Sequence, residues 1–255
     1  MSSIEFCEYS LPVERFDVAF AALAKPLVQK ALTHAGQIAG DPENLHQLRV
    51  TLRTKRSLWW AYRPLLDKEE NTRQRTLFKA LADAAGKTRD YDILIELLGW
   101  RSQLDGQLSE QLASARQRAL EASNEALGRA NLEMVLQDAL TRTSRECATT
   151  AIRQSLLAFA EGRVLAPEGI LEKRIRRATE VGGSRCGALH DVRKACKRAR
   201  YLLDLFAPIL GRPPRKRVER LKEAQTCVGN LNDLVSSEAL LREDIEFLSA
   251  MHRPE

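Results

Sequence analysis

The sequence predicts an all-α fold, and three observations support this prediction. Apolar residues recur at positions i, i+3, i+4 and i+7 along most of the chain, which is the spacing of one helix face, and strict alternation is rare. Leu, Ala, Arg, Lys, Glu and Gln dominate the composition, and all six are good helix formers. Aromatic residues, which strands favour, make up only 5% of the chain.

Eight helices are expected, with proline and glycine marking their ends. In "AGDPEN", Asp41 can cap a helix N-terminus, Pro42 fits the first helical position, and Glu43 suits the positive end of the helix dipole. Gly211 is expected to end a later helix, and the two prolines that follow begin the next. Residues 104–130 are expected to be an exposed, charged helix or hairpin arm. The expected helices span residues 13–38, 42–66, 68–85, 88–129, 132–161, 167–181, 186–209 and 213–247.

The charge balance is moderately basic, with 40 Lys and Arg residues against 34 Asp and Glu residues. A surplus of this size does not by itself indicate a polyanionic partner. What matters is whether the positive charges are concentrated in one part of the chain. The five cysteines are scattered, which argues against a disulfide framework and favours a reducing compartment. No stretch is apolar enough to span a membrane and no signal-peptide pattern is found, so a cytoplasmic location is expected.

Two basic segments follow the same pattern far apart in the chain. "LHQLRVTLRTKR" begins at Leu45 and "LHDVRKACKRAR" begins at Leu189, and their histidines and basic residues match at an offset of 144. Further along each half, a Lys, a Gly and an Asp match at an offset of 143. Two landmarks at nearly the same offset predict an internal duplication. The matched pairs are His46/His190, Arg49/Arg193, Arg53/Lys197, Arg56/Arg200, Lys79/Lys222, Gly86/Gly229 and Asp90/Asp233.

The duplication predicts two equivalent helical bundles related by an approximate two-fold axis. The chain is expected to form a single domain over residues 1–255. Repeat one is expected at about 13–130 and repeat two at about 131–247.

The basic residues of each segment share one helix face. Positions 0, +3, +7 and +10 from each histidine fall within an arc of about 80°. Lys194 and Arg198 widen the second row, whereas Lys55 is expected to point the opposite way into solvent. Like charges in a narrow row repel each other, and no acidic residue lies in the first row. An extended anion would relieve this repulsion, because phosphate groups accept charge-assisted bonds from Arg and Lys, and histidine adds a pH-dependent donor.

A simpler interpretation of each row is a solvated helix face, which is the usual role of a run of charges. The match between two rows favours a shared binding function instead. Gly86 and Gly229 are interpreted as helix-stop or close-packing residues, and Asp90 and Asp233 as N-caps of the helices that follow.

These segments, with "GKTRDYDIL" and "VGNLNDL" further along, resemble the CHAD family, the conserved-histidine α-helical domain. The resemblance extends from about residue 13 to about residue 247 and includes the basic segment "GILEKRIRRATE". It implies two four-helix bundles about a pseudo-two-fold axis with a basic central channel or groove. It also implies binding of inorganic polyphosphate at polyphosphate granules, often in association with a triphosphate tunnel (CYTH) enzyme. Nothing in this chain resembles a CYTH domain, so a stand-alone module is expected.

The resemblance also implies which residues bind the ligand. Val50 and Thr54 depart from a fully basic pattern, since the second repeat has Lys194 and Arg198 at these places. The implied polyphosphate-binding residues are His46, Arg49, Arg53, Arg56, His190, Arg193, Lys194, Lys197, Arg198 and Arg200. A second tier comprises Lys79, Lys222, Arg174 and Arg177.

Two other functions are compatible with basic helices. A histidine phosphotransfer protein or a polyphosphate-processing enzyme could use His46 or His190, but such a hydrolase needs Mg²⁺ held by clustered carboxylates, which the rows lack. Guanidiniums also repel a metal cation, so no metal or other cofactor is expected. A nucleic-acid-binding protein would share the electrostatics but needs exposed aromatic residues for base stacking. The tryptophans are instead expected to pack in the core: Trp59, Trp60 and Trp100.

The sequence therefore predicts a non-catalytic module that binds inorganic polyphosphate. Its other expected partners are a separate CYTH-type triphosphate enzyme or granule proteins. Membrane binding is not expected, and nucleic acid is disfavoured.

Overall fold

The computed structural model contains helices and no strands in the part of the chain that it describes, which confirms the all-α prediction. It describes residues 15–38, 43–84, 86–99, 106–152, 154–180, 186–211, 216, 218–224, 226, 237–238 and 241–242. The helices are α1 (Phe16–Gly36), α2 (Glu43–Tyr62), α3 (Lys68–Ala84), α4 (Lys87–Gly99), α5 (Gly106–Arg129), α6 (Leu132–Thr149), α7 (Leu156–Glu180) and α8 (Cys186–Leu210). A short 3-10 turn, Arg63–Leu65, follows α2. None of these helices is long and apolar enough to cross a bilayer.

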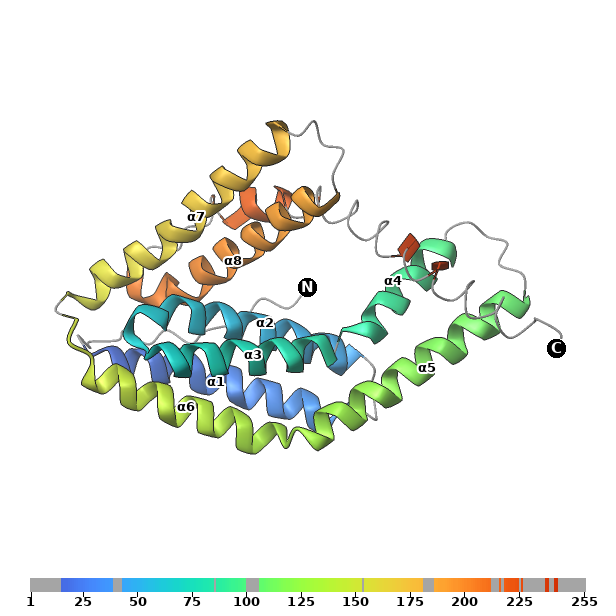
Figure 1. Ribbon diagram of the computed structural model, residues 1–255, viewed down its shortest axis with the longest axis horizontal. Helices are drawn as coiled ribbons and strands as arrows, with labels where there is room; N and C mark the ends of the chain where they lie inside the picture. Colours follow the sequence, from blue (N-terminus) through green and yellow to red (C-terminus); the bar gives the residue numbers. More distant parts are fainter. Residues whose placement is uncertain are drawn as a thin grey trace.

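The main core joins the N-terminal helices to α6 and to parts of α7 and α8. α1 packs against α2 and α6, and α2 also packs against α3 and α8 (Figure 1). At the centre, the fully buried ring of Tyr62 lies 5.0 Å from that of Phe20 in α1 and 5.2 Å from that of Phe159 in α7. Tyr62 also stacks on Phe206 of α8 at a centroid distance of 6.2 Å. These rings bury large apolar areas, and their contacts fix α7 and α8 to α2.

Two smaller buried clusters extend from this core. α7 and α8 form an antiparallel pair, and Leu171, Val192 and Cys196 pack between them (Figure 1). α4 and α5 form a second pair, held by a cluster that includes Tyr91 and Leu112. α6, which the sequence assigns to the second repeat, packs against α1 of the first. The core therefore draws on both halves of the chain.

The expected helix over residues 88–129 is two helices in the structure. α4 ends at Gly99 and α5 begins at Gly106, and residues 100–105 lie outside the described part of the chain. Most of the helix expected over 213–247 also lies outside the described residues.

The expected break before Pro167 is wrong. α7 begins at Leu156 and continues through Pro167, which is buried. The physical reason is burial upstream of the proline, because Leu156, Phe159 and Val164 lie in the main core and favour a helix that begins before them. Ser155 caps this helix, since its Oγ accepts a hydrogen bond from the Ala158 N–H at 3.1 Å. A helix that starts at Ser155 leaves the proline in its interior.

Lys55 is buried, so the expectation that it is solvated is also wrong. Its side chain is fully buried, and its Nζ lies 4.7 Å from the ring centroids of both Trp59 and Phe78. The reason lies in the geometry of α2. Lys55 is opposite the basic row, and because that row lies on the outer side, the opposite side of the helix packs into the core. Among the described residues Nζ has no hydrogen-bond partner, and burial holds the pKa of Lys55 well below its usual range.

Replacing Lys55 by methionine is expected to stabilise the fold at neutral pH. Lys55→Met retains an unbranched side chain but removes a buried amine without a hydrogen bond, whose burial costs about 1–3 kcal/mol. Because the pKa is lower in the folded than in the unfolded state, the wild type gains stability as pH rises towards the pKa of the unfolded lysine. The advantage of the variant should therefore shrink with rising pH.

Urea unfolding at neutral pH and near roughly pH 10 measures both effects. A methionine variant that is less stable than the wild type at neutral pH contradicts this expectation. So does a stability difference that does not change with pH.

Candidate functional site

The first basic row lies on α2, on the side away from the main core. Leu45, Leu48 and Leu52 are buried on the core side of the helix, and the basic side chains project from the face beside these leucines. We call this row the α2 stripe. It consists of His46, Arg49 and Arg53, which are half-buried, and Arg56, which is exposed.

Arg49 is anchored to the start of α4. Its Nη1 donates a hydrogen bond to the carbonyl oxygen of Gly86 at 2.9 Å and lies 3.4 Å from Oδ1 of Asp90. The interpretation of Asp90 as an N-cap is therefore wrong, because Asp90 lies within the first turn of α4 and its carboxylate faces Arg49. Gly86 makes the close approach possible. A Cβ at this position would lie 2.9 Å from the Asp83 carbonyl oxygen and 3.7 Å from Cζ of Arg49.

The second basic row lies on α8. Val192, Ala195 and Ala199 are buried on the inner side of this helix. We call the row the α8 stripe. Five of its members, His190, Arg193, Lys197, Arg198 and Arg200, are half-buried, and the sixth, Lys194, is exposed.

The two stripes approach each other where α8 packs against α2. The pKa of Arg53 is lowered to about 10 by burial and by Arg49, and Arg193 of the α8 stripe adds to this effect. The pKa of Arg198 is likewise lowered to about 10 by burial and by nearby cations, among them Arg174 and Arg56. Charges from opposite halves of the sequence therefore lie close enough to repel one another. We call the area formed by the two stripes the basic surface.

His46 is half-buried within this positive environment. Burial lowers its pKa below the ordinary value of 6.5, and the positive charge of Arg89 at the start of α4 lowers it further. Arg49 and Arg53 act in the same direction, and Glu43 opposes them. The free protein therefore disfavours the charged form of this histidine.

The second-tier residues are more dispersed. Lys79 of α3 and Arg177 of α7 are exposed. Arg174 of α7 is held against α8, since its Nη1 donates to the carbonyl oxygen of Asp191 at 2.8 Å and lies 3.3 Å from the carboxylate. Lys222 is exposed and, with Arg200, acts electrostatically on the half-buried Asp204. Gly229, Asp233 and the side chain of Trp100 lie outside the described residues.

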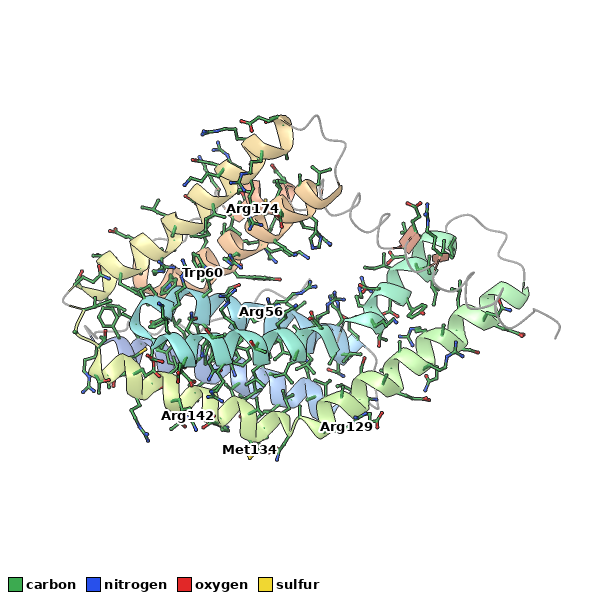
Figure 2. The ribbon with its side chains drawn as sticks, in the orientation of Figure 1. Arg56, Trp60, Arg129, Met134, Arg142 and Arg174 are labelled. Carbon is green, nitrogen blue, oxygen red and sulfur yellow. The ribbon has the colours of Figure 1, made fainter. Side chains whose placement is uncertain are left out.

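Trp60 is a residue of this surface that the sequence analysis assigned to packing. Trp59 is buried as expected, but Trp60 is half-exposed and lies among three guanidiniums. Figure 2 shows Arg56, Trp60 and Arg174 on the side where α8 lies over α2, whereas Arg129, Met134 and Arg142 lie on the outer edge formed by α5 and α6.

The position of Trp60 could have been found from helical spacing, but that of one of its partners could not. Trp60 follows Arg49 at +11, which places it on the same face of α2 as the stripe. Arg163 comes from α7 and reaches Trp60 only through tertiary packing. No local pattern in the sequence marks it.

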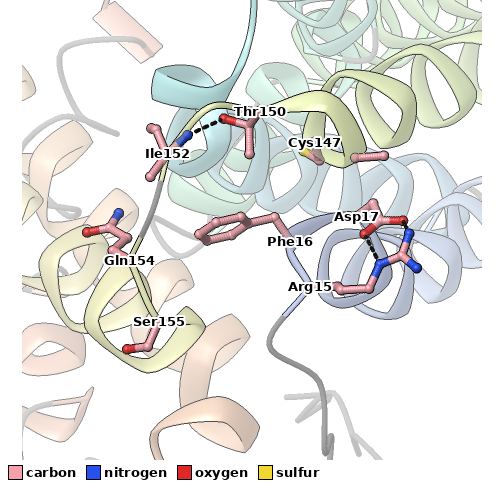
Figure 3. A pocket seen from close by; sticks show the side chains of 9 residues that line it. Arg15, Phe16, Asp17, Cys147, Thr150, Ile152, Gln154 and Ser155 are labelled. Atoms are coloured by element: carbon pink, nitrogen blue, oxygen red, sulfur yellow. Dashed lines mark hydrogen bonds and ion pairs between the residues drawn. The ribbon is translucent and has the colours of Figure 1, made fainter.

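A cavity of about 500 Å³ lies away from the basic surface, between the start of α1 and the end of α6 (Figure 3). Its lining includes the Arg15–Asp17 ion pair, with an N–O distance of 2.8 Å, and Cys147. Burial raises the pKa of Cys147 to about 12, so the thiol stays protonated and is a poor nucleophile. In the described part of the chain no group of three or more His, Cys, Asp or Glu residues is arranged to hold a metal ion.

The profile of the CHAD domain matches residues 21–242, a range that includes both stripes. The chain belongs to the CHAD family. Among solved structures, the CHAD domain from the plant Ricinus communis is similar, with a TM-score of 0.74 and 22% sequence identity over 96% of this chain and 85% of that chain. At this identity the likeness shows a shared fold. A comparison with curated proteins found no significant match.

Replacing Gly86 by alanine is expected to destabilise this CHAD domain and to displace Arg49. The added Cβ would meet a backbone oxygen at 2.9 Å, so the start of α4 must shift. Overpacking of this kind costs about 1–3 kcal/mol. Gly128→Ala is the matched control, because a Cβ there meets nothing within 4 Å and alanine favours a helix by up to about 1 kcal/mol.

Thermal and urea unfolding of both variants measure the difference. Equal stability of the Gly86 and Gly128 variants would show that the close approach at Gly86 has no energetic consequence.

Proposed function

We propose that this CHAD domain is a non-catalytic module that binds inorganic polyphosphate along the basic surface. The observation that supports it most strongly is the approach of the two stripes, in which Arg53 and Arg198 each have a pKa lowered to about 10 by burial and by neighbouring cations. Repulsion of this kind is relieved when an anion binds among the guanidiniums. Family membership supports the same function.

An internal duplication with two bundles about a pseudo-two-fold axis is part of the proposal. In it, α2 and α8 are equivalent helices, and the space between their stripes is a basic channel or groove. The matched residues on α2 and α8 support this, as does the packing of one helix against the other.

Polyphosphate suits this surface for reasons of charge spacing and width. Successive stripe residues rise about 4.5–6 Å along each helix, so a ligand must present negative charge repeatedly along its length. Most members of both stripes are half-buried, which favours a thin chain without bulky groups. Arginine forks and lysine ammonium groups both bind phosphate oxygens through charge-assisted bonds.

The cellular context that we propose is the polyphosphate granule of the cytoplasm. The partners there would be granule proteins or a separate CYTH-type triphosphate enzyme. CHAD family membership is the support for this context.

Removing one arginine from each stripe is expected to weaken polyphosphate binding severely. Arg53→Gln with Arg193→Gln keeps polar side chains and lowers the charge by two. Each lost charge-assisted bond contributes about 1.5 kcal/mol or more, which corresponds to about a tenfold loss of affinity per residue. The control is Arg129→Gln with Arg142→Gln, which removes two charges from the outer edge (Figure 2).

Titration with long-chain polyphosphate measures the affinity, and circular dichroism checks the fold. A competition with single-stranded and duplex DNA at two salt concentrations tests the rival ligand. Wild-type protein that prefers DNA, or a stripe variant that binds polyphosphate as tightly as the outer-edge control, contradicts the proposal.

Polyphosphate affinity is expected to fall as pH rises from about 6 to about 8, in part through His46. Burial and, after it, the positive surroundings lower the pKa of His46 in the free protein, and a bound anion raises this pKa again, so binding takes up a proton. Affinity is therefore lost as pH rises through the pKa of the complex. The comparison is with His46→Gln, which removes the titrating group and also controls for titration of the ligand. An identical pH profile in the two proteins would exclude this role for His46.

A further inference from the structure

We propose that Trp60 and the three arginines around it form an additional phosphate-binding subsite that extends the basic surface beyond the α2 stripe. This inference rests on the proposed polyphosphate binding and adds Trp60, Arg63 and Arg163, which the family resemblance did not supply, to Arg198, which it did. We call this group the Trp60 cluster. Its members are Trp60, Arg63, Arg163 and Arg198.

The cluster is assembled from three separate parts of the chain. The Cζ atom of Arg63, in the turn after α2, lies 4.6 Å from the centroid of the Trp60 ring. That of Arg163 in α7 lies 4.5 Å away, and that of Arg198 in α8 lies 5.0 Å away. Arg163 is fixed further by a hydrogen bond from Nη2 to the carbonyl oxygen of Trp60 at 3.4 Å. One indole ring therefore gathers cations from both halves of the sequence.

Stacking on the indole leaves the guanidiniums able to bind an anion. A guanidinium packs against an aromatic ring through its flat face, whereas its N–H groups point outward in its own plane. An arginine in this arrangement keeps N–H groups for a phosphate group, and Arg163 does so even though its Nη2 also donates to the Trp60 carbonyl oxygen. Trp60 acts as a positioning residue, because it holds the side chains in place and so lowers the entropy that they lose when a ligand binds.

The cluster concentrates positive charge in partly desolvated surroundings. Burial, with the charge of Arg63, lowers the pKa of Arg163 to about 10. The pKa of Arg198 is lowered to about the same value, and the cations that contribute include Arg63 and Arg75. The described residues offer no ion pair to Arg63, Arg163 or Arg198, in contrast to Arg49, which faces Asp90. An anion bound here would relieve the repulsion between these cations.

The cluster is continuous with the α2 stripe. Arg49, Arg53, Arg56 and Trp60 follow one another at steps of four, three and four residues, so all four lie on one face of α2. The row from His46 to Trp60 spans about 21 Å along the helix axis, compared with about 15 Å for the stripe alone. A polyphosphate chain that runs along the stripe reaches the cluster without changing direction.

The experiment compares three proteins with the wild type in titrations with long-chain polyphosphate at several salt concentrations. Arg63→Gln with Arg163→Gln removes two charges from the cluster and leaves both stripes intact. Trp60→Leu removes the ring without changing the charge. Arg129→Gln with Arg142→Gln is the charge-matched control on the outer edge, where Arg129 and Arg142 pair with Glu125 and Asp138.

Arg63→Gln with Arg163→Gln should lower the affinity for polyphosphate about tenfold or more. It should also make the slope of log K against log salt shallower by about two, as in other protein complexes with polyelectrolytes when the protein loses two phosphate contacts. Trp60→Leu should lower the affinity several-fold at an unchanged salt slope, because no charge is lost. Trp60→Phe, which keeps an aromatic face, should restore most of it. A change in tryptophan emission on binding should be present in the wild type and absent from Trp60→Phe.

The possible outcomes distinguish a failure of this inference from a failure of the proposed polyphosphate binding. Wild-type protein that does not bind polyphosphate removes the proposed function. Wild-type protein that binds, with affinity and salt slope unchanged in Arg63→Gln/Arg163→Gln, overturns the Trp60 cluster alone. Tight binding by Trp60→Leu overturns the positioning role of the indole. If the outer-edge control loses as much affinity as the cluster variant, the effect depends only on the net charge of the protein. That outcome also overturns the inference.

Discussion

The aromatic contacts of Tyr62 hold together parts of the chain whose charges repel one another. Tyr62 of α2 touches Phe159 of α7 and Phe206 of α8 in a fully buried region of the core. The packing of α8 on α2 depends on contacts of this kind. It also brings Arg53 towards Arg193 and Arg56 towards Arg198. The apolar core thus supports an unfavourable arrangement of charges at the surface.

Only some of the arginines of the basic surface and its neighbourhood have an acidic partner within the protein. Arg49 has Asp90 and the carbonyl of Gly86, and Arg174 has Asp191. The pKa values of Arg53 and Arg198 are instead lowered by burial and by repulsion from other cations close to each of them. Asp90 and Asp191 therefore hold Arg49 and Arg174 in place, whereas Arg53 and Arg198 form no ion pair with the residues that the structure describes.

The helices and the alignment of the stripes could be predicted from the sequence because both depend on local periodicity. A face that repeats every three to four residues is a property of the chain itself, and the offset of 144 relates the two rows without any coordinates. Which side of α2 faces the core was not predicted. Lys55 was misjudged because a charged residue on an apolar face looks the same in the sequence whether that face is exposed or covered.

The remaining features depend on contacts between distant segments. Asp90 is opposite Arg49 because α4 starts next to α2, and Arg163 meets Trp60 because α7 crosses the end of α2. Neither neighbour is implied by spacing along the chain. The start of α7 was missed for a different reason, since the burial of Leu156, Phe159 and Val164 in the core offsets the cost of a proline inside the helix.

The way in which α8 is held has a mechanical consequence. Its C-terminal half, with Leu202 and Phe206, is embedded in the main core, whereas its N-terminal half packs with α7 through residues such as Val192 and Cys196. The α7–α8 pair is therefore fixed to the main core at one end, through the aromatic contacts. A small change in ring volume at these aromatic contacts would shift the α7–α8 pair against α2, so side chains of the core affect how closely the two stripes approach each other.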